Sequence, residues 1–290
     1  SLMLSSIFWL YIKYNKKDKT FYNKQYWKFS LALSIPLIGN SIATQVLSVS
    51  DRTMIGKMVG NSEVGIYSTL YTVSSLSLII WQAINSSFIP YLYDNFEKRE
   101  KRKEIKNLAT KLLAAFSVVA FLLTMMAPEI VRILATKEYY EAIYIMPPIA
   151  AGVFLTSVSN MYSNVLIYHK KTNCIMISSI IAAVVNVVLN YFGIKMFGYL
   201  AAAYTTLIAY IILGMMQAII SGRVHRKITG DKTDSVYDTK MILGLSVVTI
   251  ICCVACLGLY KTTILRYAIL GVLCIIVCLK RKQIIKIFNK

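Results

Sequence analysis

The sequence predicts an all-α polytopic membrane protein, and three observations support this prediction. The 290 residues are 57% hydrophobic and only 16% charged, whereas soluble domains carry about a quarter charged residues. The apolar residues form runs close to the roughly 20 residues that a helix needs to cross hydrocarbon. These runs are continuous rather than alternating, which favours helices over the strands of a barrel.

Eight apolar runs are long enough to be considered as spans. They cover about 29–50, 64–90, 108–128, 143–168, 174–193, 199–221, 241–260 and 262–279. In the last and shortest run, Arg266 is expected to snorkel toward the interface. Residues 1–12 are also apolar but too short to span, and their positive residues follow rather than precede them, unlike a signal peptide. We expect them to be the end of a longer helix, with an interfacial anchor as the alternative.

The net charge of +19 follows the connections between the runs. Alternate connections hold 25 basic residues on one side of the membrane and 7 on the other, which is the positive-inside bias of membrane proteins. This pattern argues against nucleic acid as a partner and indicates contact with anionic membrane lipids. The segments predicted to be cytoplasmic are 13–28, 93–111, 169–172, 222–240 and the C-terminal 280–290.

The sequence carries no signature of an enzyme, a metal site or a cofactor. Cys252, Cys253 and Cys256 lie in an apolar run with no histidine nearby, which is typical of buried apolar packing rather than zinc binding. His169 and His225 lie among basic residues in segments predicted to be solvated loops. No Gly-rich phosphate loop or metal-spaced carboxylate group is present.

Polar side chains recur at helical spacing inside four of the runs. Such residues normally face a partner or a water-filled cavity. The stripes are Tyr67, Tyr71, Ser74, Gln82 and Asn85; Ser157, Asn160, Asn164 and Tyr168; Asn186 and Asn190; and Thr206, Tyr210, Gly214 and Gln217. For a single asparagine, a hydrogen bond between helices is the stronger interpretation, whereas the four stripes together favour a shared polar cavity.

The first run is expected to end at Asp51 and Arg52, near the outer boundary of the hydrocarbon. Two interpretations remain open: an interfacial pair that marks the helix end, or an arginine that binds an anionic ligand while Asp51 orients it. The planar guanidinium matches phosphate oxygens well. Pro36 in this run and Pro147 in the fourth run are candidate hinges, because proline frees a backbone carbonyl and permits bending.

The run YWKFSLALSIPLIGNSIATQVLSVSDRTMIGKMVGNSEVGIYSTLYTVSSL resembles the start of the C-terminal lobe of bacterial polysaccharide-repeat flippases. These proteins belong to the multidrug/oligosaccharidyl-lipid/polysaccharide exporter superfamily. The stretch FGYLAAAYTTLIAY at 197–210 also looks like that family. The matching elements are Pro36, Ser50-Asp51-Arg52, Met54-Ile55-Gly56, Gly60 and Gly65-Ile66-Tyr67.

The resemblance implies two six-helix lobes, alternating access, and a polyprenyl-(pyro)phosphate-linked oligosaccharide moved across the cytoplasmic membrane for surface polysaccharide export. It places a truncated helix and basic linker at 1–26, the C-terminal lobe at 27–221, a cytoplasmic loop at 222–240 and two additional helices with a basic tail at 241–290. The N-terminal lobe is then a missing partner.

The alternatives within the superfamily are a peptidoglycan-precursor flippase and a cation-coupled drug exporter, and a membrane glycan polymerase or ligase is the alternative from another class. The residues expected to contact sugar hydroxyls, the anionic group or cavity water are Asn40, Gln45, Asp51, Arg52, Tyr71, Gln82, Asn85, Asn160 and Asn164.

Overall fold

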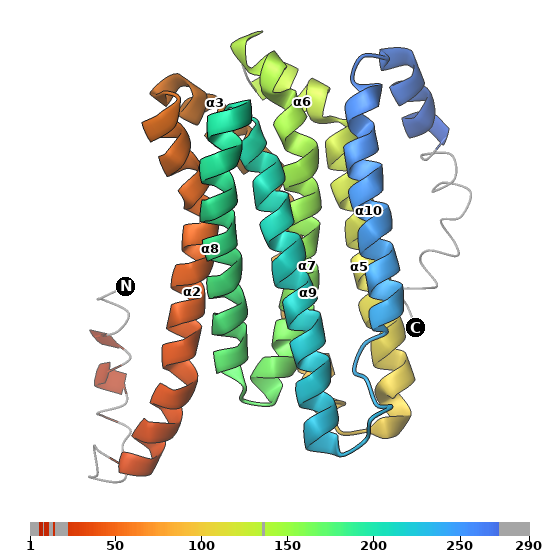
Figure 1. Ribbon diagram of the computed structural model, residues 1–290. Coiled ribbons are helices and arrows are strands. Elements are labelled where there is room, and N and C mark those ends of the chain that lie inside the picture. Colours follow the sequence, from red (N-terminus) through yellow and green to blue (C-terminus); the bar gives the residue numbers. More distant parts are fainter. Residues whose placement is uncertain (1–5, 8, 12–13, 15–22, 135–136, 273–290) are drawn as a thin grey trace.

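The structure is a computed structural model that describes residues 6–7, 9–11, 14, 23–134 and 137–272 (Figure 1). Every regular element within these residues is helical, and seven helical stretches are long and apolar enough to cross a membrane. The prediction of an all-α polytopic membrane protein is therefore confirmed. The expectation for residues 1–12 falls largely outside the described residues.

The long helices run up and down through the bundle in the order of the predicted spans (Figure 1). A shorter apolar helix, Thr263–Val272, covers the described part of the eighth predicted run. The elements are α2 (Lys24–Met58), α3 (Asn61–Ser75), α4 (Ser77–Asp94), η1 (Arg99–Lys101), α5 (Arg102–Met125), α6 (Ala127–Leu134), η2 (Lys137–Ile145), α7 (Met146–Tyr168), α8 (Thr172–Phe197), α9 (Ala201–Thr229) and α10 (Thr239–Leu259).

Local chemistry explains where several helices begin and end. The Asn23 side chain accepts hydrogen bonds from the first backbone N–H groups of α2, and Asp238 does the same for α10. Gly198 and Gly230 follow α8 and α9 with positive φ angles of 76° and 72°, which glycine adopts without a Cβ clash.

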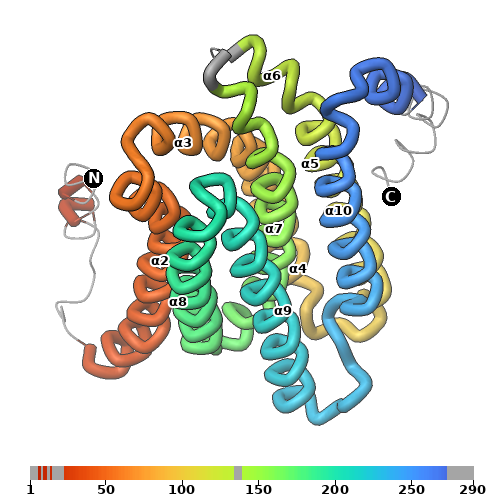
Figure 2. The backbone as a smooth tube through the Cα atoms, turned by 45° about the horizontal axis from the view of Figure 1, so that its top comes forward, coloured from red at the N-terminus to blue at the C-terminus, as the bar shows by residue number. Residues whose placement is uncertain are grey.

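The second predicted span is divided into α3 and α4 around Leu76. Ser74 and Ser75 donate their hydroxyls to backbone carbonyls of the preceding turn. Such bonds compete with the helix ladder and favour bending. Figure 2 shows α3 crossing one end of the bundle, where it contacts α2 and α7.

Helix α7 lies at the centre of the bundle and α2 at its edge. In its most apolar part, α7 is largely buried by α3, α4, α5, α9 and α10, whereas most of α2 is exposed. Helix α2 packs mainly against α8 (Figure 1). Gly39 permits this close approach, because a Cβ there would lie 2.5 Å from the Met176 sulfur.

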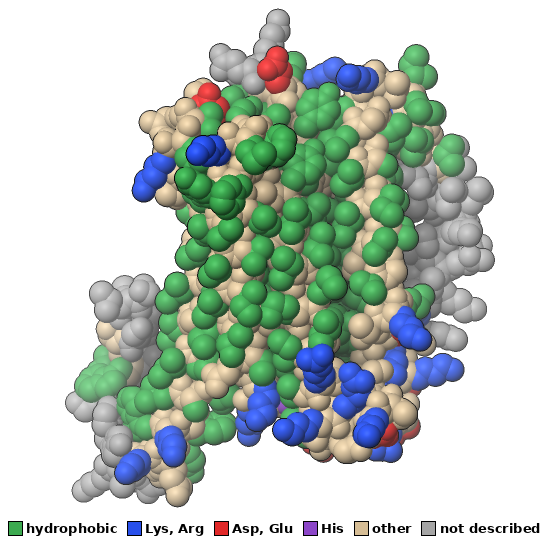
Figure 3. Space-filling model, viewed as in Figure 1, with side chains coloured by type: hydrophobic (Ala, Val, Ile, Leu, Met, Phe, Trp, Pro, Cys, Tyr) green, Lys and Arg blue, Asp and Glu red, His purple; other side chains and the backbone are tan. Residues whose placement is uncertain are grey.

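The two ends of the bundle differ in charge. On the face shown in Figure 3, apolar side chains cover the middle, and Lys and Arg gather at the end where α9 finishes and α10 begins. The short connection between α2 and α3 lies at the opposite end. Basic residues are therefore concentrated at one end of the bundle, as expected for a multi-pass membrane protein.

Candidate functional site

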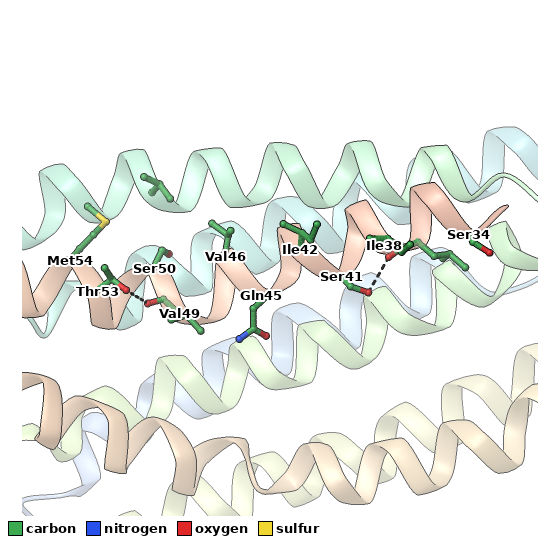
Figure 4. A pocket seen from close by; sticks show the side chains of 12 residues that line it. Ser34, Ile38, Ser41, Ile42, Gln45, Val46, Val49, Ser50, Thr53 and Met54 are labelled. Carbon is green, nitrogen blue, oxygen red and sulfur yellow. Dashed lines mark hydrogen bonds between the residues drawn. The ribbon is translucent and has the colours of Figure 1, made fainter. Parts of the chain in front are cut away.

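An open groove runs along the exposed face of α2. It has a volume of about 930 Å³ and is lined almost entirely by α2, with Val187 of α8 at its side. Figure 4 shows its side chains as a mixed row of serines, Gln45, Thr53 and aliphatic residues. The hydroxyls of Ser41 and Thr53 bond to carbonyls of their own helix, so the groove is largely apolar with a narrow polar stripe.

Asp51 is not part of the groove lining and is fully buried where α2 meets α3. Its carboxylate accepts a hydrogen bond of 2.7 Å from the Tyr67 hydroxyl and one of 2.8 Å from the backbone N–H of Arg52. A buried carboxylate requires such partners, because desolvation is costly without them. Asp51 thus joins the two helices that meet at this end of the bundle.

Arg52 is half-buried, and its guanidinium lies over the ring of Tyr71, 4.5 Å from the ring centroid. Within the described residues, Arg52 forms no ion pair, and its buried Nε has no hydrogen-bond partner. The contact with Asp51 is made by the Arg52 backbone. Arg52 therefore presents an oriented cation with free donor capacity.

The prediction that the first span ends at Asp51 and Arg52 was wrong. Helix α2 continues to Met58, and the turn occurs at Val59 and Gly60. Apolar residues between the pair and Gly60 extend the buried face, with Ile55 fully buried. The pair therefore lies inside a helix rather than at its tip.

Several predicted polar residues form hydrogen bonds across helix boundaries. Asn164 of α7 donates to Asn85 of α4 at 2.8 Å. Asn40 of α2 accepts from Ser179 of α8 at 2.6 Å. These bonds are the interhelical contacts that polar side chains make in membranes.

The most connected of these residues is Asn186 of α8, which is fully buried. It accepts hydrogen bonds from Ser50 and Asn190 at 2.7 and 3.1 Å, and it donates to Thr206 at 3.0 Å. It thereby links α2, α8 and α9. Neither Asn186 nor its partners are among the residues predicted to bind the ligand, although the i, i+4 spacing of Asn186 and Asn190 was a visible signal.

Replacing Asn186 with alanine is expected to destabilise the bundle by about 0.6–2 kcal/mol, because it leaves Ser50 and Thr206 without their shared partner. Asn160→Ala is the matched control, since Asn160 is half-buried and forms no side-chain hydrogen bond within the described residues. The measurement is reversible unfolding in mixed micelles. Equal losses for the two variants would contradict the assigned role of Asn186.

The remaining predicted residues lie apart from Arg52. Gln45 lines the groove, Gln82 is exposed on α4, and Asn160 is half-buried on α7. Pro36 is buried inside α2, whereas Pro147 lies in the first turn of α7, where a missing N–H breaks no helical hydrogen bond. The structure thus brings together Asp51, Arg52 and Tyr71 and leaves the other candidates in separate pairs or on open surfaces.

A second polar cluster, missed from the sequence, lies at the basic end. His225 is 1% exposed and lies in α9, so the prediction that it is a solvated loop residue was wrong. It contacts His169 at 3.0 Å and Asp234 at 3.0 Å. Arg102 of α5 also pairs with Asp234, at 3.3 Å, and lies against the ring of Phe96. Because most members of this cluster come from segments that are far apart in the sequence, no spacing pattern could predict it.

The stability of this cluster is expected to depend on pH through His169. Burial, together with the nearby His225 and Arg102, lowers the pKa of His169 from 6.5 to about 4. Between pH 6.5 and 4 the unfolded chain takes up a proton that the folded chain does not, so stability falls as the pH drops through this interval. Thermal unfolding should show this loss in the wild type and a smaller one in His169→Asn. Parallel pH profiles would contradict the prediction.

Comparison with known proteins finds two similarities. Residues 1–96 match the family described as "Polysaccharide biosynthesis protein". The chain is also 25% identical over 182 residues to the probable low-salt glycan biosynthesis flippase Agl15 of Haloferax volcanii. This alignment covers 62% of the chain and 39% of that relative, so the chain spans well under two thirds of the relative's length. No solved structure matches. The chain is therefore similar to polysaccharide biosynthesis proteins over its first 96 residues and to a glycan biosynthesis flippase over 182 residues.

Proposed function

We propose that the chain forms part of a flippase that moves a polyprenyl-(pyro)phosphate-linked oligosaccharide across the cytoplasmic membrane by alternating access. The glycan would then be available on the outer side of the membrane for the assembly of surface polysaccharide. The family match and the name of the relative support a glycan flippase in general terms. A transporter needs no catalytic group, and we propose no enzymatic activity.

The observation that carries this proposal is Arg52, which follows the buried Asp51 in α2 and precedes Thr53 in the lining of the groove. Its guanidinium is held against Tyr71, is only partly exposed, and keeps an unpaired Nε. A cation that is half-buried in an apolar bundle and forms no ion pair within the described residues is costly, which supports a role in binding an anion. The (pyro)phosphate of a lipid-linked glycan has the charge and oxygen geometry that a guanidinium binds.

We further propose that a second lobe covers the groove. Residues 34–54 of α2 provide its wall, yet this helix is the least buried of the spans at its apolar centre. Polar residues such as Gln45 would face lipid there without a covering partner. An N-terminal lobe would close the groove into a central cavity, and rocking of the two lobes would expose that cavity to each side in turn.

The function is tested by depleting the complete protein in its native cells and following the lipid-linked oligosaccharide. The proposal predicts that the intact lipid-linked unit accumulates and that surface polysaccharide falls. Accumulation of shorter, unfinished units would instead indicate a step in glycan assembly, and accumulation of peptidoglycan precursors would indicate the alternative cargo.

The orientation is proposed to place the basic end in the cytoplasm, and single-cysteine labelling tests it. A cysteine at Lys103, which is exposed at the basic end, should resist an impermeant reagent added outside intact cells. A cysteine at Lys57, exposed at the far end of α2, should react. The background must lack the native cysteines. Outside labelling at position 103 would overturn the orientation.

A further inference from the structure

A second cavity lies at the basic end, between α5, α9 and the segment that leads into α10. Its volume is about 610 Å³, enough for a phosphate-bearing headgroup. Its lining is unusually rich in positive charge for a single concave site. The basic lining residues are Lys106 of α5, Arg223 and Arg226 of α9, Lys232 of the connection and Lys240 of α10.

The carboxylates of this cavity already have partners. Asp234 is bound by Arg102 and His225, and Asp238 caps α10 by accepting a hydrogen bond from the Met241 N–H. The positive groups, by contrast, have no carboxylate partner within the described residues. In the same part of the chain, Arg226 alone among them donates a side-chain hydrogen bond, to the carbonyl of Gly222 in its own helix. The side chains that line the cavity therefore carry a net positive charge. Their potentials add inside the cavity and attract an anion.

The position of the cavity indicates an amphiphilic ligand. Ile219 lines its wall and is 47% exposed, and Met241, which follows Lys240, is 60% exposed. Exposed apolar side chains continue along both helices, with Ile208 and Met215 on α9 and Leu243 and Val247 on α10. Both helices pack against α7 (Figure 1). A phosphate in the cavity would thus lie where the charged end of the bundle meets its apolar belt.

We propose that this cavity binds the phosphate headgroup of an anionic membrane phospholipid, whose acyl chains lie along the exposed faces of α9 and α10. Lys106 and Arg223 would contact the phosphate from two helices, and Lys240 would close the site from the third. Such a lipid would join the connection after α9 to the core of the bundle, independently of the transported cargo.

The test is a lipid titration of the complete protein in detergent, followed by native mass spectrometry. Phosphatidylglycerol and phosphatidylcholine with the same acyl chains are compared. Arg223→Gln/Lys240→Gln removes two charges from the cavity, and Lys98→Gln/Lys103→Gln removes two exposed charges from the same end outside it. Size-exclusion profiles establish that both variants stay folded.

We expect wild type to retain phosphatidylglycerol in preference to phosphatidylcholine. The cavity variant should lose about 30-fold in affinity for phosphatidylglycerol, and the control variant should change little. If both variants lost the same affinity for phosphatidylglycerol, binding would depend on the general surface charge of this end, and the proposal would be overturned. Displacement of phosphatidylglycerol by a comparable concentration of inorganic pyrophosphate would also overturn it, because the site would then bind a free anion and not a lipid.

Discussion

Replacing Arg52 with alanine is expected to abolish glycan export, a loss of at least about tenfold, while the protein level stays near normal. The guanidinium lies over Tyr71, its Nε is unpaired, and it forms no ion pair within the described residues, so its removal breaks no ion pair there. Asp51 keeps its bonds, because it contacts the Tyr67 hydroxyl and the Arg52 backbone. The effect should therefore fall on ligand binding and not on folding.

Arg52→Lys should restore only part of the export, because an ammonium lacks the two-pronged geometry of the guanidinium. Lys57→Ala, an exposed cation in the last turn of the same helix, is the matched control and should export normally. Export is normalised to protein level for each version. Normal export by Arg52→Ala would remove Arg52 from the site and leave the uncharged residues as candidates.

The largest expected effect on stability concerns a buried ion pair at the other end of the bundle from the histidines. Arg266 pairs with Glu129 of α6, and Tyr267 also donates a hydrogen bond of 2.7 Å to that carboxylate. The Arg266 side chain is 1% exposed, so the prediction that it snorkels to the interface was wrong. The Glu129 carboxylate therefore balances the Arg266 charge inside the protein, so the guanidinium does not need to reach the membrane interface.

Glu129→Ala should destabilise the protein by about 3–5 kcal/mol, because it leaves the Arg266 charge buried without a partner. The double variant Glu129→Leu/Arg266→Met should recover most of this loss, since no charge then remains buried. Unfolding in mixed micelles measures both.

Glu104→Ala is the matched control for this prediction. It breaks an exposed pair with Lys101 and should cost less than about 1 kcal/mol. If the single Glu129 variant were as stable as this control, or if the double variant were less stable than the single one, the assigned energetics of the Arg266 pair would be incorrect.

The positions of the helices were predictable from the sequence because length and apolarity alone specify a membrane span. The run predicted at 174–193 corresponds to α8, Thr172–Phe197, and that at 241–260 to α10, Thr239–Leu259. The division at Leu76 was not predicted, because it depends on which carbonyls the neighbouring serines bind.

The pairing of side chains was much less predictable. Helical spacing indicates which residues share a face, but not which helix that face meets. Asn85 and Asn164 were both expected to contact ligand, yet they bond to each other. The cluster of His225 with Asp234 and Arg102 requires three distant segments to converge, which only the packed bundle reveals.

The measurement that tests the proposed function most directly is translocation in sealed vesicles containing the purified complete protein and a fluorescent polyprenyl-pyrophosphate-linked oligosaccharide. An impermeant glycan-binding quencher reports the outward-facing fraction. We predict that the wild type makes nearly all of the lipid-linked glycan accessible over time and that Arg52→Ala leaves the inner fraction protected. If the folded wild type left as much lipid-linked glycan inaccessible to the quencher as protein-free vesicles do, the proposed flippase function would be contradicted.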